Sequence, residues 1–490
     1  MLLSELFKQI HGIDRAGTSD VQIRGIAYDS RLVQAGDLFV AIKGEKTDGA
    51  LFVGQAISRG AVAIASESSI EAQPAVATFT IPDARRFLAE GSRIVYQDPS
   101  IKLKLVGITG TNGKTTTSYL MHSLFSRAGI PSCLVGTIGM NIGNAGYPSK
   151  HTTPEASDLM KFLHQALTEG CTHGAMEVSS HSLALKRVFG VKFAVGVFMN
   201  LTQDHLDYHK DMESYFQAKG LLFSRENDNR VESAVINIDD AYGERLAKQV
   251  PCPVVRFGFS SSADIHVTEF HSHPDRSELI LATPAGRAEF HLHLIGRPNA
   301  SNIMAATGAA LCLGLNLDEI REGVEALRGV PGRLEIVKAG QDFAVIVDYA
   351  HSPDALENLL KTVAQLPHAR IITLFGCGGD RDRTKRPIMG EIAASMSDFV
   401  IATSDNPRSE DPLDILKEVE AGLRKGAAPY RMMPDRGQAI EAAISMAQKS
   451  DAVVIAGKGH EDYQIIGNRS LPFDDRKVAA DLIKKRLNDG

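Results

Sequence analysis

The chain has 490 residues, enough for two to four domains at roughly 100–200 residues each. Hydrophobic residues make up 43% and charged residues 23%, an ordinary globular balance, and the formal net charge of −6 provides no basic field for nucleic acid. The five cysteines are odd in number and widely spaced, which argues against a disulfide scaffold or a zinc ribbon and favours a reducing cytoplasm.

The first block of the chain, residues 1–100, begins with a short amphipathic pattern at 1–14 that predicts a helix and not a signal peptide. Short apolar runs at 37–42 and 61–65 follow, with turns between them, and the turn-rich stretch 97–100 is a candidate linker. No run of 18 apolar residues occurs, so no membrane-spanning segment is expected.

The second block, 101–332, alternates strand-like runs with helical patterns, which predicts a parallel α/β sheet. A strand is expected at 103–108 and a helix at 114–128, ended by Gly129 and Pro131. Further strands are expected at 175–178, 193–198 and 234–238.

The third block, 333–490, repeats this alternation, and each of its apolar runs ends at a polar, Gly-rich cluster. Ligands of open parallel sheets bind beyond the carboxyl ends of the strands, so these clusters predict a binding site. The runs lie at 343–347, 371–375, 399–402 and 452–456.

A phosphate-binding loop is predicted between the first strand and first helix of the second block. The core pattern GxxGKT is intact, although the glycine that would begin the stricter GxxxxGK[ST] pattern falls one position early, at 107. Backbone N–H groups can approach phosphate, Lys114 can neutralise its charge, and Thr115 can place its hydroxyl on Mg²⁺. A Gly-rich turn with a helix cap is the weaker alternative. The loop residues are Gly110, Thr111, Asn112, Gly113, Lys114, Thr115 and Thr116.

The loop sequence GTNGKTT resembles that of the Mur ligases and of their relative folylpolyglutamate synthase, and further motifs follow in the family's order over nearly the whole chain. The resemblance implies three α/β domains: a uridine-nucleotide-binding domain at 1–100, a central parallel-sheet P-loop ATPase domain at 101–332 and a C-terminal Rossmann-like domain at 333–490. It also implies an ATP- and Mg²⁺-dependent amide ligase, in which a carboxylate becomes an acyl phosphate that an amine attacks.

By resemblance, Glu177, His205 and a carbamylated Lys219 join Thr115 in holding Mg²⁺, and with Lys114 they form the expected catalytic set. The residues alone suggest less. A single Glu is usually solvated or capping, His205 lies in a polar loop without the spacing of a zinc site, and Lys219 resembles any helix-surface lysine.

Two further motifs are expected to meet the nucleotide. In the pattern GxxNxxN at 296–302, the family contact is Asn302, whereas Asn299 is predicted to be a helix N-cap. Asp348 and His351 follow a strand of the third block and, by resemblance, close over ATP. A simple strand-end turn containing Ser-Pro has the same appearance in sequence.

The substrate contacts come from the resemblance as well. The uridine-nucleotide peptide is expected at Ser30, Thr152, Thr153, Ser179 and Arg187. The Thr pair also fits a cap for a helix that begins near residue 154. Two departures from the family pattern affect this site: Ala50 stands where many relatives carry His, and Leu185 where some carry Gln.

The sequence Asp405-Asn406-Pro407-Arg408 resembles the motif of the diaminopimelate-adding branch. An Arg fork can pair bidentately with the distal carboxylate of meso-diaminopimelate, while Asp and Asn orient its amino group. L-Lysine lacks that carboxylate. A Pro turn with a solvated Arg is the alternative in isolation. The whole amino-acid site is expected at Arg381, Asp405, Asn406, Pro407, Arg408, Gly457 and Glu461.

The resemblance therefore implies a cytoplasmic, monomeric ligase that adds meso-diaminopimelate to UDP-N-acetylmuramoyl-L-alanyl-D-glutamate in peptidoglycan precursor synthesis, without nucleic-acid or membrane partners. A lysine-adding relative is the nearest alternative, and Arg408 argues against it. Folylpolyglutamate synthase lacks the first block, and a P-loop switch or motor would hydrolyse ATP without an amino acid.

Overall fold

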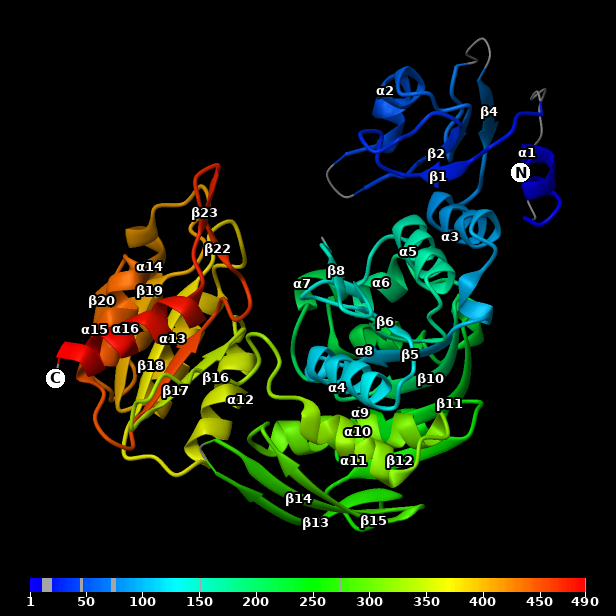
Figure 1. The fold of residues 1–490 in the computed structure, drawn as a ribbon. Coiled ribbons are helices and arrows are strands. Elements are labelled where there is room, and N and C mark those ends of the chain that lie inside the picture. Colours follow the sequence, from blue (N-terminus) through cyan, green and yellow to red (C-terminus); the bar gives the residue numbers. More distant parts are fainter. Residues whose placement is uncertain (11–19, 45–46, 72–75, 150, 274, 490) are drawn as a thin grey trace.

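The structure is a computed structural model that describes residues 1–10, 20–44, 47–71, 76–149, 151–273 and 275–489. Three α/β lobes follow one another along the chain (Figure 1). The N-terminal lobe, in blue, lies above the middle lobe, in cyan and green, and the C-terminal lobe, in yellow to red, lies to the left. This confirms the predicted α/β class with parallel sheets.

The N-terminal sheet is parallel, in the order β1-β2-β3-β4. Alternate residues of β2 face opposite sides: Leu38 and Val40 join a core with α1 and α3, whereas Phe39 and Ala41 join one with α2. Burial of both faces explains the continuous apolar run. The predicted N-terminal helix is short, and residues 11–14 of that prediction lie outside the described residues. The elements are α1 (Leu3–Phe7), β1 (Gly25–Ala27), β2 (Asp37–Ala41), a 3-10 turn (Gly49–Phe52), α2 (Val53–Ser58), β3 (Ala63–Ser66), β4 (Ala77–Thr80), α3 (Ala84–Val95) and a second 3-10 turn (Pro99–Ile101).

The middle lobe is built on one sheet in the order β15-β14-β13-β12-β11-β10-β5-β9-β6-β7-β8. On the central strand β5, Leu105 faces the core beneath α5, and Val106 and Ile108 face α4 and α10. The predicted first strand and first helix are confirmed, and Gly129 ends α4 with a φ of +68°. The strands are β5 (Lys104–Thr109), β6 (Ser132–Val135), β7 (Met140–Ile142), β8 (Ala145–Tyr147), β9 (His173–Glu177), β10 (Lys192–Phe198), β11 (Arg230–Asn237), β12 (Val254–Gly258), β13 (Ile265–Ser272), β14 (Ser277–Thr283) and β15 (Gly286–Leu292).

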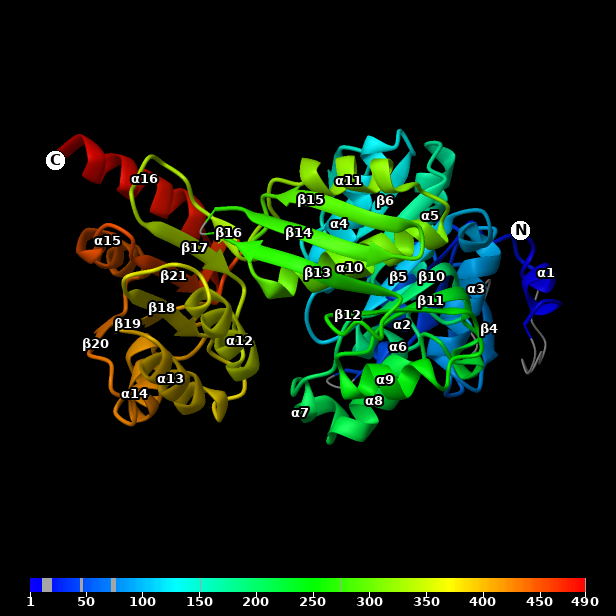
Figure 2. The ribbon, with the colours of Figure 1, turned by 90° about the horizontal axis from the view of Figure 1, so that it is seen from below.

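Helices cover both faces of this sheet. They are α4 (Lys114–Arg127), α5 (Ala156–Thr168), α6 (Ser180–Ala184), α7 (Leu206–His209), α8 (Met212–Gly220), α9 (Ala241–Ala247), α10 (Arg297–Cys312) and α11 (Leu317–Ala326), with a 3-10 turn at Arg225–Asn227. The last three strands pair antiparallel and extend toward the C-terminal lobe (Figure 2).

The C-terminal sheet runs β16-β17-β21-β18-β19-β20 and is parallel except at β16. Helices α12, α13 and α14 cover one face, and α15 and α16 cover the other. The elements are β16 (Glu335–Ile336), β17 (Ala344–Asp348), α12 (Pro353–Ala364), β18 (Ile371–Cys377), α13 (Lys385–Met396), β19 (Phe399–Ser404), α14 (Pro412–Leu423), β20 (Tyr430–Met433), α15 (Arg436–Met446), β21 (Ala452–Ala456), β22 (Tyr463–Ile466), β23 (Arg469–Pro472) and α16 (Asp475–Asp489). Over the described ranges, no helix is both long and apolar enough to cross a bilayer.

A buried ion pair lies beneath the carboxyl ends of β19 and β21. Arg436 donates to both carboxylate oxygens of Asp475, at 2.7 and 2.6 Å, and both side chains are fully buried. The same guanidinium donates to the carbonyls of Ser404, at 3.2 Å, and Ala456, at 3.1 Å. These are the last residues of the two strands, so Arg436 fixes the points where their loops begin.

Replacing Arg436 with methionine leaves Asp475 buried without its counter-charge. Removing one partner of a buried ion pair costs about 3–5 kcal/mol, so R436M is expected to lower the thermal unfolding midpoint of the C-terminal lobe. The exposed pair of Arg245 and Glu213 offers a matched control, R245M, for which we expect little change. Equal midpoints for R436M and the parent protein would contradict the role given to this pair.

Candidate functional site

The phosphate loop joins β5 to α4, as predicted, and its lysine is held in place by the loop itself. Lys114 Nζ donates to the carbonyls of Gly110 and Thr111, at 2.9 Å each. Burial lowers the pKa of Lys114, and Arg333 adds to this effect while Glu177 opposes it. The ammonium therefore lies at the mouth of the loop, where a phosphate group would offer better-matched charge than the two carbonyls.

Glu177, the last residue of β9, is the anionic centre of the site. Its carboxylate accepts hydrogen bonds from Thr115 Oγ1 at 2.9 Å, Thr137 N at 2.8 Å and Thr137 Oγ1 at 3.1 Å. Only 1% of the residue is exposed, so the solvated interpretation is wrong. Gly136 is required here because a Cβ atom would lie 2.4 Å from Glu177 Oε1.

Lys219 lies on α8 but points into the protein, and only 1% of it is exposed. The expectation of a solvated lysine, drawn from the residue alone, is wrong. Its Nζ donates to Gly110 O at 2.9 Å, the carbonyl that Lys114 also contacts, and lies 4.5 Å from the centre of the Tyr215 ring. Burial, with the neighbouring Lys114 charge, lowers the pKa of Lys219 well below its usual value. This lowered pKa favours the neutral amine over the ammonium.

His205 lies across Tyr215 from Lys219. It has a left-handed backbone with a φ of +54°, and its ring centre is 6.1 Å from that of Tyr215 and 4.8 Å from that of His181. Burial lowers the pKa of His205 to about 4, so its imidazole is neutral at pH 7, and its Nε2 lies 3.4 Å from Asp204 Oδ2. Within the described part of the chain, no three His, Cys, Asp or Glu side chains are grouped as ligands of one ion.

The predicted peptide contacts of the middle lobe surround Glu177. Thr152 Oγ1 lies 3.0 Å from Thr137 Oγ1, Thr153 Oγ1 donates to Glu177 O at 2.8 Å, and Arg187 Nη1 donates to Thr153 O at 3.0 Å. Ser179 follows two residues after Glu177 and caps α6.

The interpretation of the Thr pair as a helix cap is wrong. Helix α5 begins at Ala156, with Glu155 at its N-cap position and no side-chain cap bond. Glu155 instead pairs with Arg187 Nε at 2.8 Å. The Thr hydroxyls are thus committed to the end of β9, beside the carboxylate of Glu177.

Asn299 is also not a cap, because α10 begins at Arg297 after Gly296. It accepts from Asn302 Nδ2 at 3.0 Å and orients that side chain. Asn302 packs directly on the phosphate loop: a Cβ at Gly113, whose φ is +89°, would lie 2.5 Å from Asn302 Oδ1. The second Asn of the motif is therefore the one that touches the loop.

Two residues beyond the middle lobe, Asp354 and Arg333, contact the phosphate loop, and Asp348 lies behind them. Asp348 ends β17, and burial raises its pKa. Beyond the exposed His351, Asp354 accepts from Thr202 Oγ1 at 2.7 Å and from Asn112 Nδ2 at 3.4 Å. Arg333, in the segment between the lobes, reaches Thr115 Oγ1 at 3.3 Å.

The residues predicted to bind the amino acid lie where β18, β19 and β21 end. Arg408 has a left-handed backbone with a φ of +52°, and its Nη1 donates to Gly379 O at 2.8 Å. Asn406 Nδ2 donates to Glu461 Oε2 at 2.9 Å. A Cβ at Gly457, whose φ is +115°, would lie 3.1 Å from Asp405 Oδ2. The two predicted strand-end clusters thus form one pocket wall.

The remaining predicted residues lie around this wall. Pro407 is buried, and Arg381 is exposed on the loop after β18. Arg386 is fully buried and forms ion pairs with Glu410 and Glu418, each at 2.8 Å. These pairs fix the loop that carries Arg408. The strained Arg408 backbone therefore rests on a rigid support.

The predicted uridine-nucleotide residue lies in the N-terminal lobe. Ser30 is buried at the end of the β1 loop, and its Oγ donates to Gln55 Oε1 at 2.6 Å. Ala50, the departure from the family pattern, lies in the 3-10 turn, where Asp48 Oδ1 accepts from its backbone N–H. Leu185, the other departure, ends α6.

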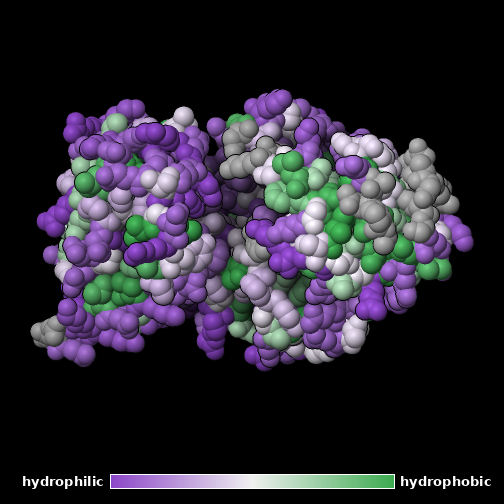
Figure 3. Space-filling model, turned by 90° about the horizontal axis from the view of Figure 1, so that it is seen from above, coloured by the Kyte–Doolittle hydropathy of each residue, from purple (hydrophilic) through white to green (hydrophobic). Residues whose placement is uncertain are grey.

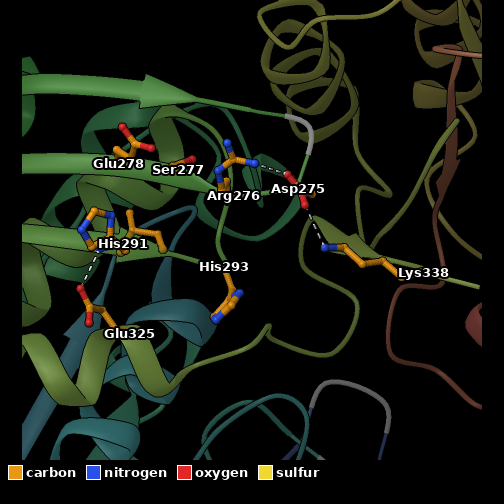
Figure 4. Close-up of a pocket in the computed structure, with 9 residues that line it drawn as sticks. Asp275, Arg276, Ser277, Glu278, His291, His293, Glu325 and Lys338 are labelled. Carbon is orange, nitrogen blue, oxygen red and sulfur yellow. Dashed lines mark hydrogen bonds and ion pairs between the residues drawn. The ribbon is translucent and has the colours of Figure 1, made fainter. Parts of the chain in front are cut away.

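A groove separates the C-terminal lobe from the other two lobes. Figure 3 shows this groove from above as a largely hydrophilic furrow between the C-terminal lobe and the other two. A separate cavity of about 500 Å³ lies at the antiparallel extension, where Asp275 bonds Arg276 and Lys338 (Figure 4). None of the predicted site residues lines it.

Three contacts of this site escaped the sequence interpretation. Arg333 lies in a loop and Asp354 in the first turn of α12, and their partners Thr115 and Thr202 are 218 and 152 residues away in the chain. Thr137 had a usable signal, since it follows β6 within a strand-end cluster of Gly, Thr and Gly. Ligands bind beyond the carboxyl ends of parallel strands, and this rule applies to the residues after β6 as it does to Glu177 after β9.

Comparisons with known proteins cover the whole chain. Family models match at residues 22–100 (Mur ligase family, catalytic domain), 108–310 (Mur ligase middle domain) and 332–459 (Mur ligase, glutamate ligase domain). A UDP-N-acetylmuramoyl-L-alanyl-D-glutamate–2,6-diaminopimelate ligase of Geobacter metallireducens is 43% identical over 100% of both chains. That of Gloeobacter violaceus is 46% identical, over 100% of this chain and 99% of the relative.

A solved structure of a ligase with the same name is 33% identical, covers 99% of both chains and superimposes with a TM-score of 0.70. Sequence, motif order and fold agree along the full length. The chain belongs to the Mur ligase family.

Proposed function

We propose that the protein joins meso-2,6-diaminopimelate to the D-glutamyl γ-carboxylate of UDP-N-acetylmuramoyl-L-alanyl-D-glutamate with ATP. The observation that carries this proposal is the pocket wall after β19 and β21, where the Arg408 guanidinium bonds the carbonyls of Gly379 and Asn406. The Asn406 amide in turn bonds the carboxylate of Glu461. Such a wall matches a ligand end that bears both an ammonium and a carboxylate. The names of the relatives point to the same amino acid.

The reaction has two steps. A carboxylate oxygen of the D-glutamyl side chain attacks the γ-phosphorus of ATP, and the bond to ADP breaks. The free amine of diaminopimelate then attacks the acyl carbon, phosphate leaves with the bonding pair, and the nitrogen loses its proton. No side chain near the pocket stands out as the acceptor of that proton.

Lys114 and Arg333 supply the protein's positive charge to the transferring phosphoryl group. Both lie next to Thr115: Lys114 precedes it, and Arg333 Nη2 bonds its hydroxyl at 3.3 Å. Arg333 Nε is buried without a hydrogen-bond partner, which supports a role as a donor to a ligand. Cations fixed before the reaction stabilise charge that develops on phosphate oxygens.

The residues around Glu177 fit Mg²⁺. The Glu177 carboxylate, the Thr115 hydroxyl and the neutral imidazole of His205 provide ligands, and a carbamate on Lys219 would add a second anionic group. Bound Mg²⁺ would supply positive charge to the phosphate oxygens. The proximity of Lys219 to Lys114 supports the carbamate, because it replaces a disfavoured second cation with an anion.

The other roles follow from position. Thr152, Thr153, Ser179 and Arg187 would hold the peptide beside Glu177, and Ser30 would bind the uridine nucleotide. Asn302, Asp348 and His351 would complete the nucleotide site. The C-terminal lobe would carry the amine toward the acyl carbon by closing over the groove. The proposed compartment is the cytoplasm, and the proposed state is a monomer.

The assay that tests the function measures ADP release with Mg²⁺-ATP and the UDP-linked dipeptide, adding meso-diaminopimelate, L-lysine or no amino acid. Release and tripeptide formation are expected only with diaminopimelate, because only it offers a distal carboxylate to Arg408. ADP release with L-lysine but not with diaminopimelate would support a ligase and contradict the proposed amino-acid specificity. Equal release in all three would indicate an uncoupled ATPase or a nucleotide switch.

Removing the Arg408 fork should affect diaminopimelate selectively. Each of the two charged hydrogen bonds of a bidentate pair contributes about 1.5–3 kcal/mol, so R408M is expected to lower kcat/KM for diaminopimelate by about 10²- to 10⁴-fold. R408K should recover little, because an ammonium cannot bond bidentately. The exposed Arg431 on β20 provides the control variant R431M. Equal kcat/KM values for diaminopimelate in R408M and R431M would contradict the role given to Arg408.

A carbamate on Lys219 has a direct spectroscopic test. Protein equilibrated with ¹³C-bicarbonate should show one protected carbamate carbon resonance at neutral pH, because the lowered pKa leaves the amine free to react with CO₂. Acidification should remove the signal as the amine regains its proton. K219Q should lack both signal and ligation, whereas K248Q, at an exposed lysine, should keep both. Full activity in K219Q would exclude the carbamate.

A further inference from the structure

Lys458, which follows β21, is a fully buried cation in the wall of the amino-acid pocket. Its side chain has no exposed surface, and its Nζ lies 2.9 Å from Glu461 Oε2, 3.2 Å from Asn406 Oδ1 and 4.0 Å from Asp405 Oδ1. An ammonium has three donors and no acceptor. Here it faces three oxygens, and each belongs to a residue with a predicted role in binding the amino acid.

These contacts join two loops into one unit. Glu461 follows β21, whereas Asn406 and Asp405 follow β19, and Lys458 bridges the pair of loops. Asn406 Oδ1 also accepts from Ile465 N at 2.9 Å, so its amide has a fixed orientation with Nδ2 toward Glu461. The carboxylate of Glu461 is therefore held by two donors, one from each loop.

The pocket wall is balanced in formal charge only when Lys458 is counted. Asp405 and Glu461 contribute two negative charges, and Arg408 and Lys458 contribute two positive charges. A ligand end with both ammonium and carboxylate keeps that balance. A ligand end with an ammonium alone adds a net positive charge next to a buried cation, where poor solvation makes like charges costly.

We propose that Lys458 is a positioning and specificity residue for the amino acid. It holds Glu461 and Asn406 for the distal ammonium, and its charge disfavours a side chain that ends in an ammonium alone. This inference depends on the proposed function for the identity of the amino acid, and it goes beyond it by assigning a residue that need not touch the ligand.

The experiment compares K458M, K458Q and K458R with the parent protein, measuring kcat and KM for meso-diaminopimelate and for L-lysine. K458M should raise KM for diaminopimelate at least tenfold with a smaller change in kcat. It should also lower the ratio of kcat/KM for diaminopimelate to that for L-lysine at least tenfold. K458R keeps the charge and should keep most of the ratio. Lys449, exposed before β21, gives the control K449M.

Several controls separate this role from simple support of the fold. K458Q lacks the charge but keeps a hydrogen-bond donor, so it tests specificity if K458M unfolds, and thermal unfolding is measured for each variant. An equal loss of kcat/KM for both amino acids, or an unchanged ratio in folded K458Q, would overturn the proposal. A parent protein that does not use diaminopimelate would instead refute the proposed function, whatever the variants do.

Discussion

The hydrogen bonds converging on Glu177 unite the parts of the middle lobe. The phosphate loop reaches this carboxylate through Thr115, and the loop after β6 reaches it through Thr137. The loop before α5 bonds the backbone carbonyl of the same residue through Thr153. These segments come from separate strands and meet because parallel strands end at one edge of a sheet. One buried anion therefore sets the spacing between the phosphate loop and the loop before α5, and a bound cation would join an arrangement that already exists.

In the C-terminal lobe, the side chains after β19 and β21 are charged and must be held apart without solvent between them. Two buried arginines provide the support. Arg436 fixes the strand ends from below through Asp475 and two carbonyls, and Arg386 fixes the loop of Arg408 through Glu410. Buried charges of this kind contribute little net stability but enforce one arrangement. Rigid loops suit a site that must tell two similar amino acids apart.

The sequence was sufficient for the fold class, the strands and the phosphate loop, because apolar runs that end in glycine have a local physical cause. Contacts between residues far apart in the chain could not be predicted in this way. The pattern of α8 does not show that its Lys219 faces the phosphate loop, since the covering residues are more than one hundred positions away. Thr153 and Asn299 were misjudged as helix caps because short-range rules favour capping, whereas tertiary contacts decide their partners. Arg333 carried no local signal at all.

The short segment between the middle and C-terminal lobes has a thermodynamic consequence. Gly332 and Leu334 take left-handed backbones, and Gly332 packs so closely on Gly459 that no side chain would fit. Arg333, between them, contacts the phosphate loop directly. Any ligand that competes for Arg333 must then bind the possible orientations of the lobes with different affinities. If a bound nucleotide draws Arg333 away from Thr115, nucleotide binding and lobe orientation become linked equilibria, and substrates that favour the same orientation strengthen one another's binding.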